Sequence, residues 1–236
     1  MSSPKIKGLV FDKDGTLFDF NATWGAWTRG MLAAETNGDR ALFDQLAAAL
    51  GYDTANNGFL PGSIVIASTA REVADTIMPI TGETDRGALL SRMNTAAAEV
   101  SQVEAVPLVG YFDGLLALDL KLGIVTNDAE APARRHLERA AVIDHFHFIA
   151  GYDSGHGAKP APGQLLAFSA ATGLDPGVCM MVGDSTHDLH AGRAAGMRTI
   201  GVLTGPAPKD ELAPYADVVL PDIGHIPDWL RSAGLI

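Results

Sequence analysis

Short apolar runs recur along this chain, each leading into a polar or glycine-containing turn, and this recurrence constrains the fold most. The runs contain β-branched or aromatic residues and occupy positions 6–11, 122–126, 145–150, 178–182, 199–203 and 217–220. Their length and composition are typical of buried strands. Helical patterns lie between most of them, at 132–141, 164–172 and 187–195, and another covers 226–232. Strands that alternate with helices predict an α/β fold with a Rossmann-like, doubly wound parallel sheet.

The stretch 20–105 has a different character, because its apolar residues follow helical spacing. We expect helices at 21–35, 40–50, 63–77 and 85–103. Only residues 64–66 hint at a strand, and Pro61-Gly62 just before them fits a helix start better. This pattern predicts an α-helical cap domain at 20–105, inserted into a core made of residues 1–19 and 106–236. We expect hinges near 19–21 and 104–108.

Size and charge limit the classes of function. The 236 residues carry a formal net charge of −11, which argues against nucleic acid and anionic membranes as partners. No apolar run approaches the roughly 18 residues of a membrane span. The first five residues, Met1 to Lys5, lack signal-peptide features, so we expect a cytoplasmic protein. Cys179 is the one cysteine, which excludes an intramolecular disulfide. A monomer and a homodimer are both compatible with the sequence.

The first chemical motif is DKDGT at 12–16, directly after the first predicted strand. Asp12 and Asp14 can both reach one site at the carboxyl edge of a parallel sheet. One carboxylate can act as a nucleophile and its neighbour as an acid and base. A polar turn is the plainer alternative. A calcium loop is excluded, because Leu17 and Thr23 occupy the positions where it needs glycine and glutamate.

Two further motifs offer groups for an anion. Thr126 and Asn127 end the second predicted strand, where a hydroxyl and an amide could hold phosphoryl oxygens. Any turn at a strand end could have this composition. Lys159, in GAKP before a helix, could keep a nearby carboxylate ionised and offset phosphate charge. A surface lysine is the alternative for this residue taken alone.

The last motif, VGDSTHD at 182–188, follows an apolar strand and opens a helix. Asp184 and Asp188 are two more carboxylates at a strand end. Such oxygen ligands suit a hard cation, and Mg²⁺ is the natural choice. The alternative is that Asp184 only caps the helix.

Taken together, the four motifs resemble the haloacid dehalogenase superfamily of aspartate-nucleophile hydrolases. The residues that carry the resemblance lie in family order: Asp12, Asp14, Thr126, Lys159, Asp184 and Asp188. The insertion after the first strand is similar to the helical cap of the phosphoglycolate phosphatase and β-phosphoglucomutase-like branch. The resemblance implies a Mg²⁺-dependent phosphatase that hydrolyses a small phosphomonoester through an aspartyl-phosphate.

The resemblance also implies a role for each motif residue. Asp12 attacks phosphorus, and Asp14 protonates the leaving alcohol and then activates water. Thr126 and the backbone of Asn127 bind phosphoryl oxygens, while Lys159 neutralises charge.

The implied metal ligands are the carboxylate of Asp12, the backbone carbonyl of Asp14, and Asp184, with Asp188 orienting the metal shell. Lys13 departs from the branch, which often has an aromatic or aliphatic residue there. If the segment is extended, the Lys13 side chain should point away from the two carboxylates.

Other chemistries of the same superfamily can be weighed. A dehalogenase should lack a carboxylate at position 14, so Asp14 argues against one. A phosphonatase needs a cap lysine, and none lies between Phe20 and Val106. A phosphomutase, which uses the same core residues, and an inactive phosphate-binding module both remain open.

The cap offers few candidates for binding the rest of the substrate. Arg71, with Arg29, is among the few cap cations that could meet an anionic tail, although a solvated arginine is the alternative. Trp24 and Trp27 could wall the substrate site or pack within the cap. The identity of the substrate is not encoded in any motif.

Overall fold

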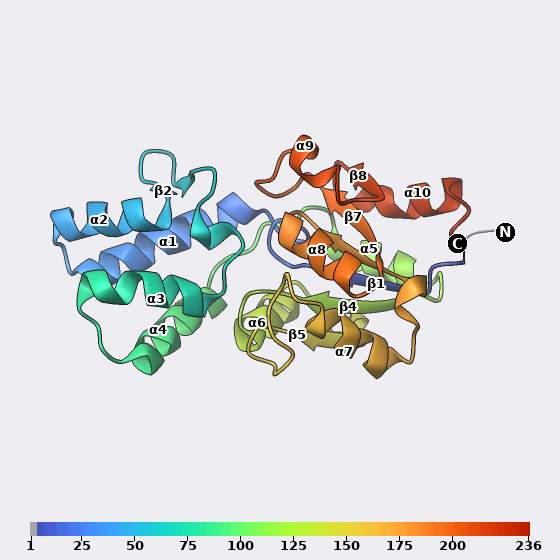
Figure 1. Ribbon diagram of the computed structural model, residues 1–236, viewed down its shortest axis with the longest axis horizontal. Helices are drawn as coiled ribbons and strands as arrows, with labels where there is room; N and C mark the ends of the chain where they lie inside the picture. The colour runs from blue at the N-terminus through green and yellow to red at the C-terminus, as the bar shows by residue number, and fades with distance from the viewer. Residues whose placement is uncertain (1–3) are drawn as a thin grey trace.

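A six-stranded parallel sheet forms the centre of the larger lobe (Figure 1). The structure is a computed structural model that describes residues 4–236. The expectation about signal-peptide features at Met1 to Lys5 therefore lies partly outside the described residues. The strand order is β5-β4-β1-β6-β7-β8, and every neighbouring pair is parallel. All six expected strands and the α/β class are confirmed. The strands are β1 (Gly8–Phe11), β4 (Lys121–Val125), β5 (Phe148–Ala150), β6 (Cys179–Gly183), β7 (Arg198–Val202) and β8 (Val218–Leu220).

Helices cover both faces of this sheet because alternate strand residues point to opposite sides. On β1, Leu9 and Phe11 pack in one apolar cluster with residues of α5 and α10. Val10 packs in another with residues of α7 and α8. The core helices are α5 (Leu108–Leu116), α6 (Glu130–Arg139), α7 (Gly163–Thr172), α8 (Thr186–Ala194), α9 (Lys209–Leu212) and α10 (Ile226–Ser232). Helices α5 and α9 were not expected, since two glycines interrupt the first and the second is one turn long.

The register brings the motif residues to one edge. Phe11 at the end of β1 aligns with Ile124 of β4 and with Val182 of β6. The residues that follow these strands therefore emerge side by side. After β5 the chain crosses back to β6 on the other side of β1, which makes this edge a topological switch point, where α/β sheets bind ligands.

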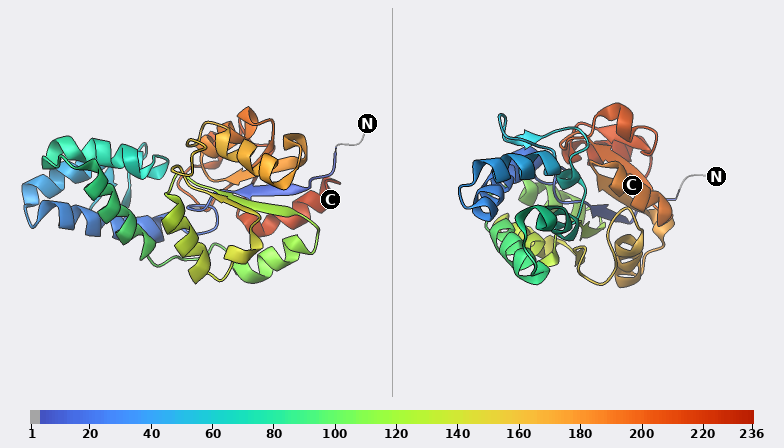
Figure 2. Two further views of the ribbon diagram at one scale, coloured as in Figure 1. Left: turned by 90° about the horizontal axis from the view of Figure 1, so that it is seen from below. Right: turned by 60° about the vertical axis from the view of Figure 1, so that its left-hand side comes forward.

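The smaller lobe is helical and lies beside that edge of the sheet (Figure 2). It is inserted between β1 and β4 and has an apolar cluster of its own, which includes Leu32, Leu46, Leu50, Ile77 and Leu89. Its helices are α1 (Phe20–Thr36), α2 (Arg40–Leu50), α3 (Ala70–Thr81) and α4 (Arg86–Ala98). The division of the chain at 19/20 and 105/106 stays a prediction.

Within the cap, two expected helices differ from the structure. The single helix expected at 63–77 is wrong: a 3-10 turn, Ile64–Ile66, precedes α3. Helix α3 begins at Ala70, where Thr69 and Glu72 form a capping box, and it continues past Pro79. Helix α4 ends at Ala98 rather than near 103. A short hairpin of β2 (Tyr52–Asp53) and β3 (Gly58–Phe59) was also not expected, because each strand has only two residues.

The two chain segments that connect the lobes run next to each other. The amide of Asp19 donates to the carbonyl of Val103 at 2.8 Å, and the amide of Ala105 donates to Leu17 at 2.8 Å. These contacts fall where the hinges are expected.

No helix in residues 4–236 is both long and apolar enough to cross a membrane.

Candidate active site

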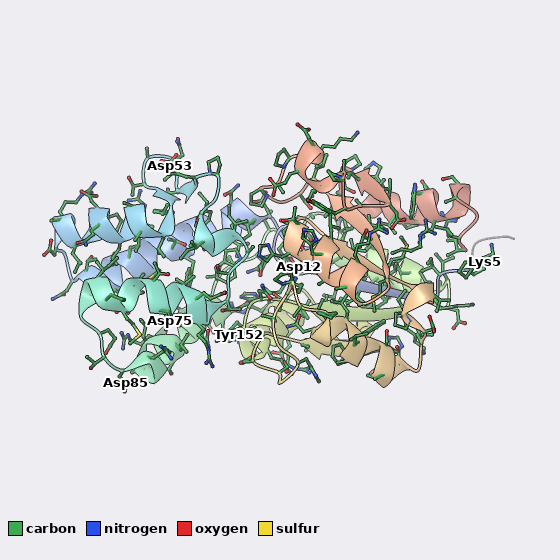
Figure 3. The ribbon with its side chains drawn as sticks, viewed as in Figure 1. Lys5, Asp12, Asp53, Asp75, Asp85 and Tyr152 are labelled. Atoms are coloured by element: carbon green, nitrogen blue, oxygen red, sulfur yellow. The ribbon has the colours of Figure 1, made fainter. Side chains whose placement is uncertain are left out.

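A cavity of about 740 Å³ of empty space, partly open to solvent, lies between the carboxyl edge of the sheet and the cap. Asp12 sits at the end of the core that faces the cap helices (Figure 3). Seven of the predicted site residues line this cavity: Asp12, Asp14, Thr126, Asn127, Lys159, Asp184 and Asp188. Residues that lie more than 170 positions apart in the chain, such as Asp12 and Asp184, thus meet at one place.

Lys159 joins two of these carboxylates. Its Nζ lies 2.6 Å from Oδ1 of Asp12, 2.6 Å from Oδ1 of Asp188 and 3.1 Å from the carbonyl of Val125. Burial acts to lower the pKa of Lys159, but attraction to Asp12 and Asp188 outweighs it and raises this pKa above its ordinary value. Lys159 therefore stays charged and is placed to offset negative charge beside Asp12.

The carboxylates of Asp12, Asp184 and Asp188 form a buried acidic cluster, with one oxygen of each within 4.8 Å of the others. Burial raises the pKa of Asp12 to about 7 against the opposing pull of Lys159, and it also raises the pKa of Asp184. Buried carboxylates that share one ammonium group need further positive charge to be ionised together. Oxygen donors in this number and spacing fit a hard divalent cation. The Asp14 carboxylate is not in this cluster, and a role for its backbone carbonyl stays a prediction.

Close packing of a turn against Asp184 depends on glycine. Gly15 has a φ of +81°, and a Cβ there would lie 2.3 Å from Oδ2 of Asp184. A Cβ on Gly205 would lie 1.7 Å from the same atom. Thr16 Oγ1 donates to Oδ1 of Asp184 at 3.2 Å. The DKDGT turn and the loop after β7 therefore hold Asp184 from both sides.

Asp188, rather than Asp184, takes part in capping helix α8. The N-cap is Ser185, and Asp188 Oδ2 accepts from the amide and the hydroxyl of Ser185 at 3.0 and 2.7 Å. The alternative that Asp184 caps the helix is thus wrong. Because Asp188 also holds Lys159 through its other oxygen, the start of α8 and the lysine form one hydrogen-bonded unit.

Lys13 occupies a place that the sequence did not predict. Its Nζ lies 2.6 and 2.7 Å from the two oxygens of Asp14 and 3.3 Å from Oδ2 of Asp128. The Lys13 side chain was expected to point away from the paired carboxylates only if the segment is extended, and this condition is not met, because the chain bends just after β1. The Lys13 side chain is completely buried. Burial acts to lower its pKa, but Asp14 and Asp128 raise it, so Lys13 remains an ammonium.

His136 continues this network toward the cap. Its Nδ1 lies 3.0 Å from Nζ of Lys13, and its Nε2 lies 2.8 Å from the carbonyl of Ala97 on α4. Since Lys13 donates, Nδ1 accepts and Nε2 carries the proton. Burial, reinforced by the charge of Lys13, lowers the pKa of His136 to about 4. Lys13 Nζ also lies over the ring of Trp24, 5.4 Å from the ring centroid, so two cap residues contact the network.

Sequence reasoning gave no role to Asp128 or His136. Asp128 stands beside the Thr126-Asn127 motif, so its position at a strand end was a usable signal. Burial raises its pKa to about 6 against the opposing charge of Lys13. His136 lies within a helix and had no signal of this kind.

Asn127 links three segments through its side-chain amide. Nδ2 donates to the carbonyls of Ala67 in the cap and Lys159 in the core at 2.8 and 2.9 Å, and Oδ1 accepts from the amide of Lys159 at 2.9 Å. Thr126 Oγ1 accepts from the amide of Asp128 at 3.0 Å. The Asn127 side chain therefore positions the loop, which leaves only its backbone for the predicted phosphoryl contact.

Arg71 is the predicted site residue that the structure does not bring to the cavity. Ala70 and Val73 of α3 line the cavity, whereas Arg71 is exposed. One residue along a helix turns the side chain by about 100°, which takes Arg71 off the lining face. Its charge acts on Tyr152 instead, where it opposes the rise in that pKa caused mainly by burial. Trp24 and Trp27 do line the cavity.

A switch-point aspartate that is ion-paired to a buried lysine, beside a cluster suited to a divalent cation, is an arrangement that suits an α/β hydrolase that uses carboxylates. The family follows from comparison. The chain belongs to the haloacid dehalogenase-like hydrolases, whose family model matches residues 9–202.

Relatives of known name agree with this family. A phosphoglycolate phosphatase of Chromobacterium violaceum is 37% identical over 126 residues, which are 52% of this chain and 56% of that protein. The chain thus spans about half the length of such relatives in the alignment. Hexitol phosphatase B of Escherichia coli is 28% identical over 96% of this chain and 97% of its own.

A solved structure has the same fold. A predicted phosphoglycolate phosphatase of Haemophilus somnus superposes with a TM-score of 0.70 at 18% identity, covering 95% of this chain and 97% of that one. This likeness confirms a core with an inserted helical cap.

Proposed function

We propose that this protein is a Mg²⁺-dependent phosphatase that hydrolyses a small phosphomonoester through an aspartyl-phosphate on Asp12. The observation that carries the proposal is the 2.6 Å contact between Lys159 and Asp12 inside the acidic cluster, with Asp14 two residues away. This arrangement supplies a nucleophile, charge compensation and an acid beside one cavity.

Each residue has a chemical task in this mechanism. An oxygen of Asp12 forms a bond to phosphorus while the bond from phosphorus to the substrate alcohol breaks. Asp14, in its protonated form, gives a proton to the departing alcohol, and the resulting carboxylate later takes one from the water that hydrolyses the acyl phosphate. Lys159 offsets charge on the phosphoryl oxygens, and Thr126 and the Asn127 backbone orient them.

Mg²⁺ is the cofactor in this proposal. Asp12, Asp184 and Asp188 surround the place that fits a divalent cation, with the Asp14 carbonyl as a further ligand. When bound, the cation would polarise the phosphoryl group and neutralise part of its charge. The buried carboxylates then keep their ionised forms without further lysines.

Several related proteins support a small phosphorylated substrate, since their names describe phosphatases of phosphoglycolate and hexitol phosphates. The proposal extends to this chain only the reaction class. The proposal also includes that the protein acts in the cytoplasm as a monomer or homodimer.

The test is release of inorganic phosphate from a panel of phosphomonoesters by the magnesium-loaded protein. Asp12→Asn should lower kcat by about 10⁴-fold or more, and a chelator should abolish turnover. The variant should unfold with the same cooperativity as the wild type, as the folding control. Full activity of Asp12→Asn, or no turnover of any compound by folded protein, would overturn the proposal. Transfer of phosphate between sugar positions without release would indicate a phosphomutase.

A further inference from the structure

The two sides of the cavity differ in the chemistry that they offer a substrate. The core side presents carboxylates, Lys159 and polar strand ends. The cap side presents large apolar side chains from α1, the 3-10 turn, α3 and α4, and these are Phe20, Trp24, Trp27, Val65, Val73 and Met93. Because the phosphoryl group belongs beside Asp12 and Lys159, the alcohol part of the substrate must face the cap.

No cationic side chain of the described cap lines this cavity. Among its lining residues in 4–236, only Lys159 and His187 are basic, and both belong to the core. Residues 20–105 contain five arginines and no lysine. Arg71 is exposed and outside the lining. The other four have partners elsewhere: Arg29 on Thr54 and Asn57, Arg40 on Asp44, Arg86 on Asp75, and Arg92 on Glu35 and Glu83.

An anionic tail would therefore be poorly placed here. It would lose water against tryptophan, valine and methionine side chains, and it would face a site that already holds the carboxylates of Asp12, Asp14, Asp128, Asp184 and Asp188. A charge buried without a partner is strongly disfavoured.

A sugar chain would also be poorly matched, because each buried hydroxyl needs a hydrogen-bond partner. The polar side chains that the cap contributes to the lining are Ser68 and Asn94. The indole Nε1 of Trp27 is buried and has no hydrogen-bond partner, so it offers the cavity no exposed donor. Ser68 and Asn94 could satisfy one or two neutral polar atoms, not a polyol.

The aromatic residues are arranged to hold an apolar group. Trp24 and Trp27 lie edge to face, with ring centroids 5.2 Å apart and an angle of 86° between the planes. Both rings line the cavity, and Phe20 lies on the same helix. Such surfaces pack well against a flat or branched hydrocarbon.

We infer that the substrate is a phosphomonoester whose alcohol part is uncharged and largely apolar, with an aryl or alkyl body packed on Trp24 and Trp27. The inference rests on the proposed function for the position of the phosphoryl group. It separates this chain from relatives named for phosphoglycolate or hexitol phosphates.

Turnover provides the first test. Benzyl phosphate, 2-phosphoglycolate and sorbitol 6-phosphate all release an aliphatic alcohol, so differences among them report recognition by the cavity. The kcat/KM for benzyl phosphate should exceed the other two by about 100-fold. Equal or higher values for 2-phosphoglycolate or sorbitol 6-phosphate would overturn the inference and leave the phosphatase proposal intact.

Binding tests the same preference without chemistry. The magnesium-loaded protein should bind 2-phenylethylphosphonate at least about tenfold more tightly than 3-phosphonopropanoate by calorimetry. If this preference holds while no ester is hydrolysed, the proposed function fails and the ligand is not a substrate, but the preference of the cavity for an uncharged, apolar body stands. Tighter binding of 3-phosphonopropanoate overturns the inference whatever the turnover.

A substitution in the cap then locates the preference. Val65 is half-buried and lines the cavity, so Val65→Arg should shift the ratio of the two affinities toward 3-phosphonopropanoate by about tenfold or more. Thr95→Arg adds the same charge at an exposed position of α4 outside the lining and should leave the ratio unchanged. An unchanged ratio in folded Val65→Arg means that the cap does not meet the alcohol part, which overturns the inference.

Discussion

The core side and the cap side of the cavity are built in opposite ways. On the core side, polar groups from three strand ends and from the loop after β5 are fixed by short contacts, such as the two 2.6 Å bonds of Lys159. On the cap side, helices present apolar surface, and the arginines of the cap lie elsewhere. Under the proposed function, this difference means that the sheet edge determines which bond is broken, while the inserted helices select which molecule carries that bond.

If the reaction belongs to the core side, loss of the acid should have the largest effect. Asp14→Asn should lower kcat for alkyl phosphates by about 10²- to 10⁴-fold, because the alcohol then leaves without a proton. The loss should be much smaller for an aryl phosphate, whose phenolate leaves readily. Steady-state kinetics with matched alkyl and aryl esters measure both values.

Asp128→Asn is the matched control, since Asp128 lines the same cavity and shares Lys13 with Asp14. It should change kcat by less than about tenfold. A larger effect of Asp128→Asn than of Asp14→Asn would show that the assignment of the acid to Asp14 is wrong.

The next largest effect concerns the buried cation of the core. Lys13→Met leaves the carboxylates of Asp14 and Asp128 without their ammonium partner and should lower the free energy of unfolding by about 3–5 kcal/mol. Urea denaturation of the metal-free protein measures it. Lys7→Met, at an exposed position, should change stability by less than about 0.5 kcal/mol.

The double variant Lys13→Met with Asp14→Asn sharpens the interpretation. Part of the lost stability should return, because one of the unpaired charges is removed as well. Full additivity of the two changes would show that the ion pair carries no coupling.

The contact between core and cap through His136 predicts a smaller, pH-dependent effect. The folded pKa of His136 is about 4, below its ordinary value of 6.5, so the unfolded chain binds a proton that the folded one excludes between these values. The contribution of His136 to the free energy of unfolding is therefore fully present above pH 6.5 and is lost as the pH falls toward 4. The loss is on the order of 3 kcal/mol.

His136→Gln removes this titration and keeps a polar side chain. Denaturation at pH 7 and pH 4 should show a smaller loss for the variant than for the wild type by that amount. Parallel losses in both proteins would mean that the imidazole is accessible to protons in the folded state.

The proposed Mg²⁺ site on the core side predicts the smallest of these effects. Because burial raises the pKa of Asp12 to about 7 in the metal-free protein, Mg²⁺ must displace a proton below that pH. At concentrations about 100-fold above Kd, Mg²⁺ should raise Tm by about 5–10 °C at pH 8 and by much less at pH 5.5. Scanning calorimetry of wild type and Asp184→Asn measures this, and an equal shift in both proteins would place the metal elsewhere.

The sequence revealed the core side well, for a physical reason. Strands in a parallel sheet end at a common edge, so Asp12, Thr126 and Asp184 could be placed together from their positions after apolar runs alone. Lys159 followed from its chemistry beside these groups. Their exact partners could not be foreseen, as the inward turn of Lys13 shows, because a bend after β1 is decided by tertiary contacts.

The cap side was predicted only as helical. Which face of each helix meets the cavity depends on how the lobes are packed, and the sequence does not give that packing. Arg71 and Val73 are two residues apart, yet one is exposed and the other lines the cavity. The break between the 3-10 turn and α3 arises from the capping box at Thr69. It was not predicted, because the residues on both sides of Thr69 are compatible with one continuous helix.

The paired connections between the lobes have a consequence for how such proteins diversify. The chain leaves the core at Asp19 and returns beside it at Val103. With respect to the core, the entire cap is therefore one long loop whose two ends are hydrogen-bonded to each other. Exchanging that loop for another of different length changes the closure entropy only slowly. A lineage could therefore replace its whole cap as a cassette, keeping the sheet register and the reaction while acquiring a new substrate.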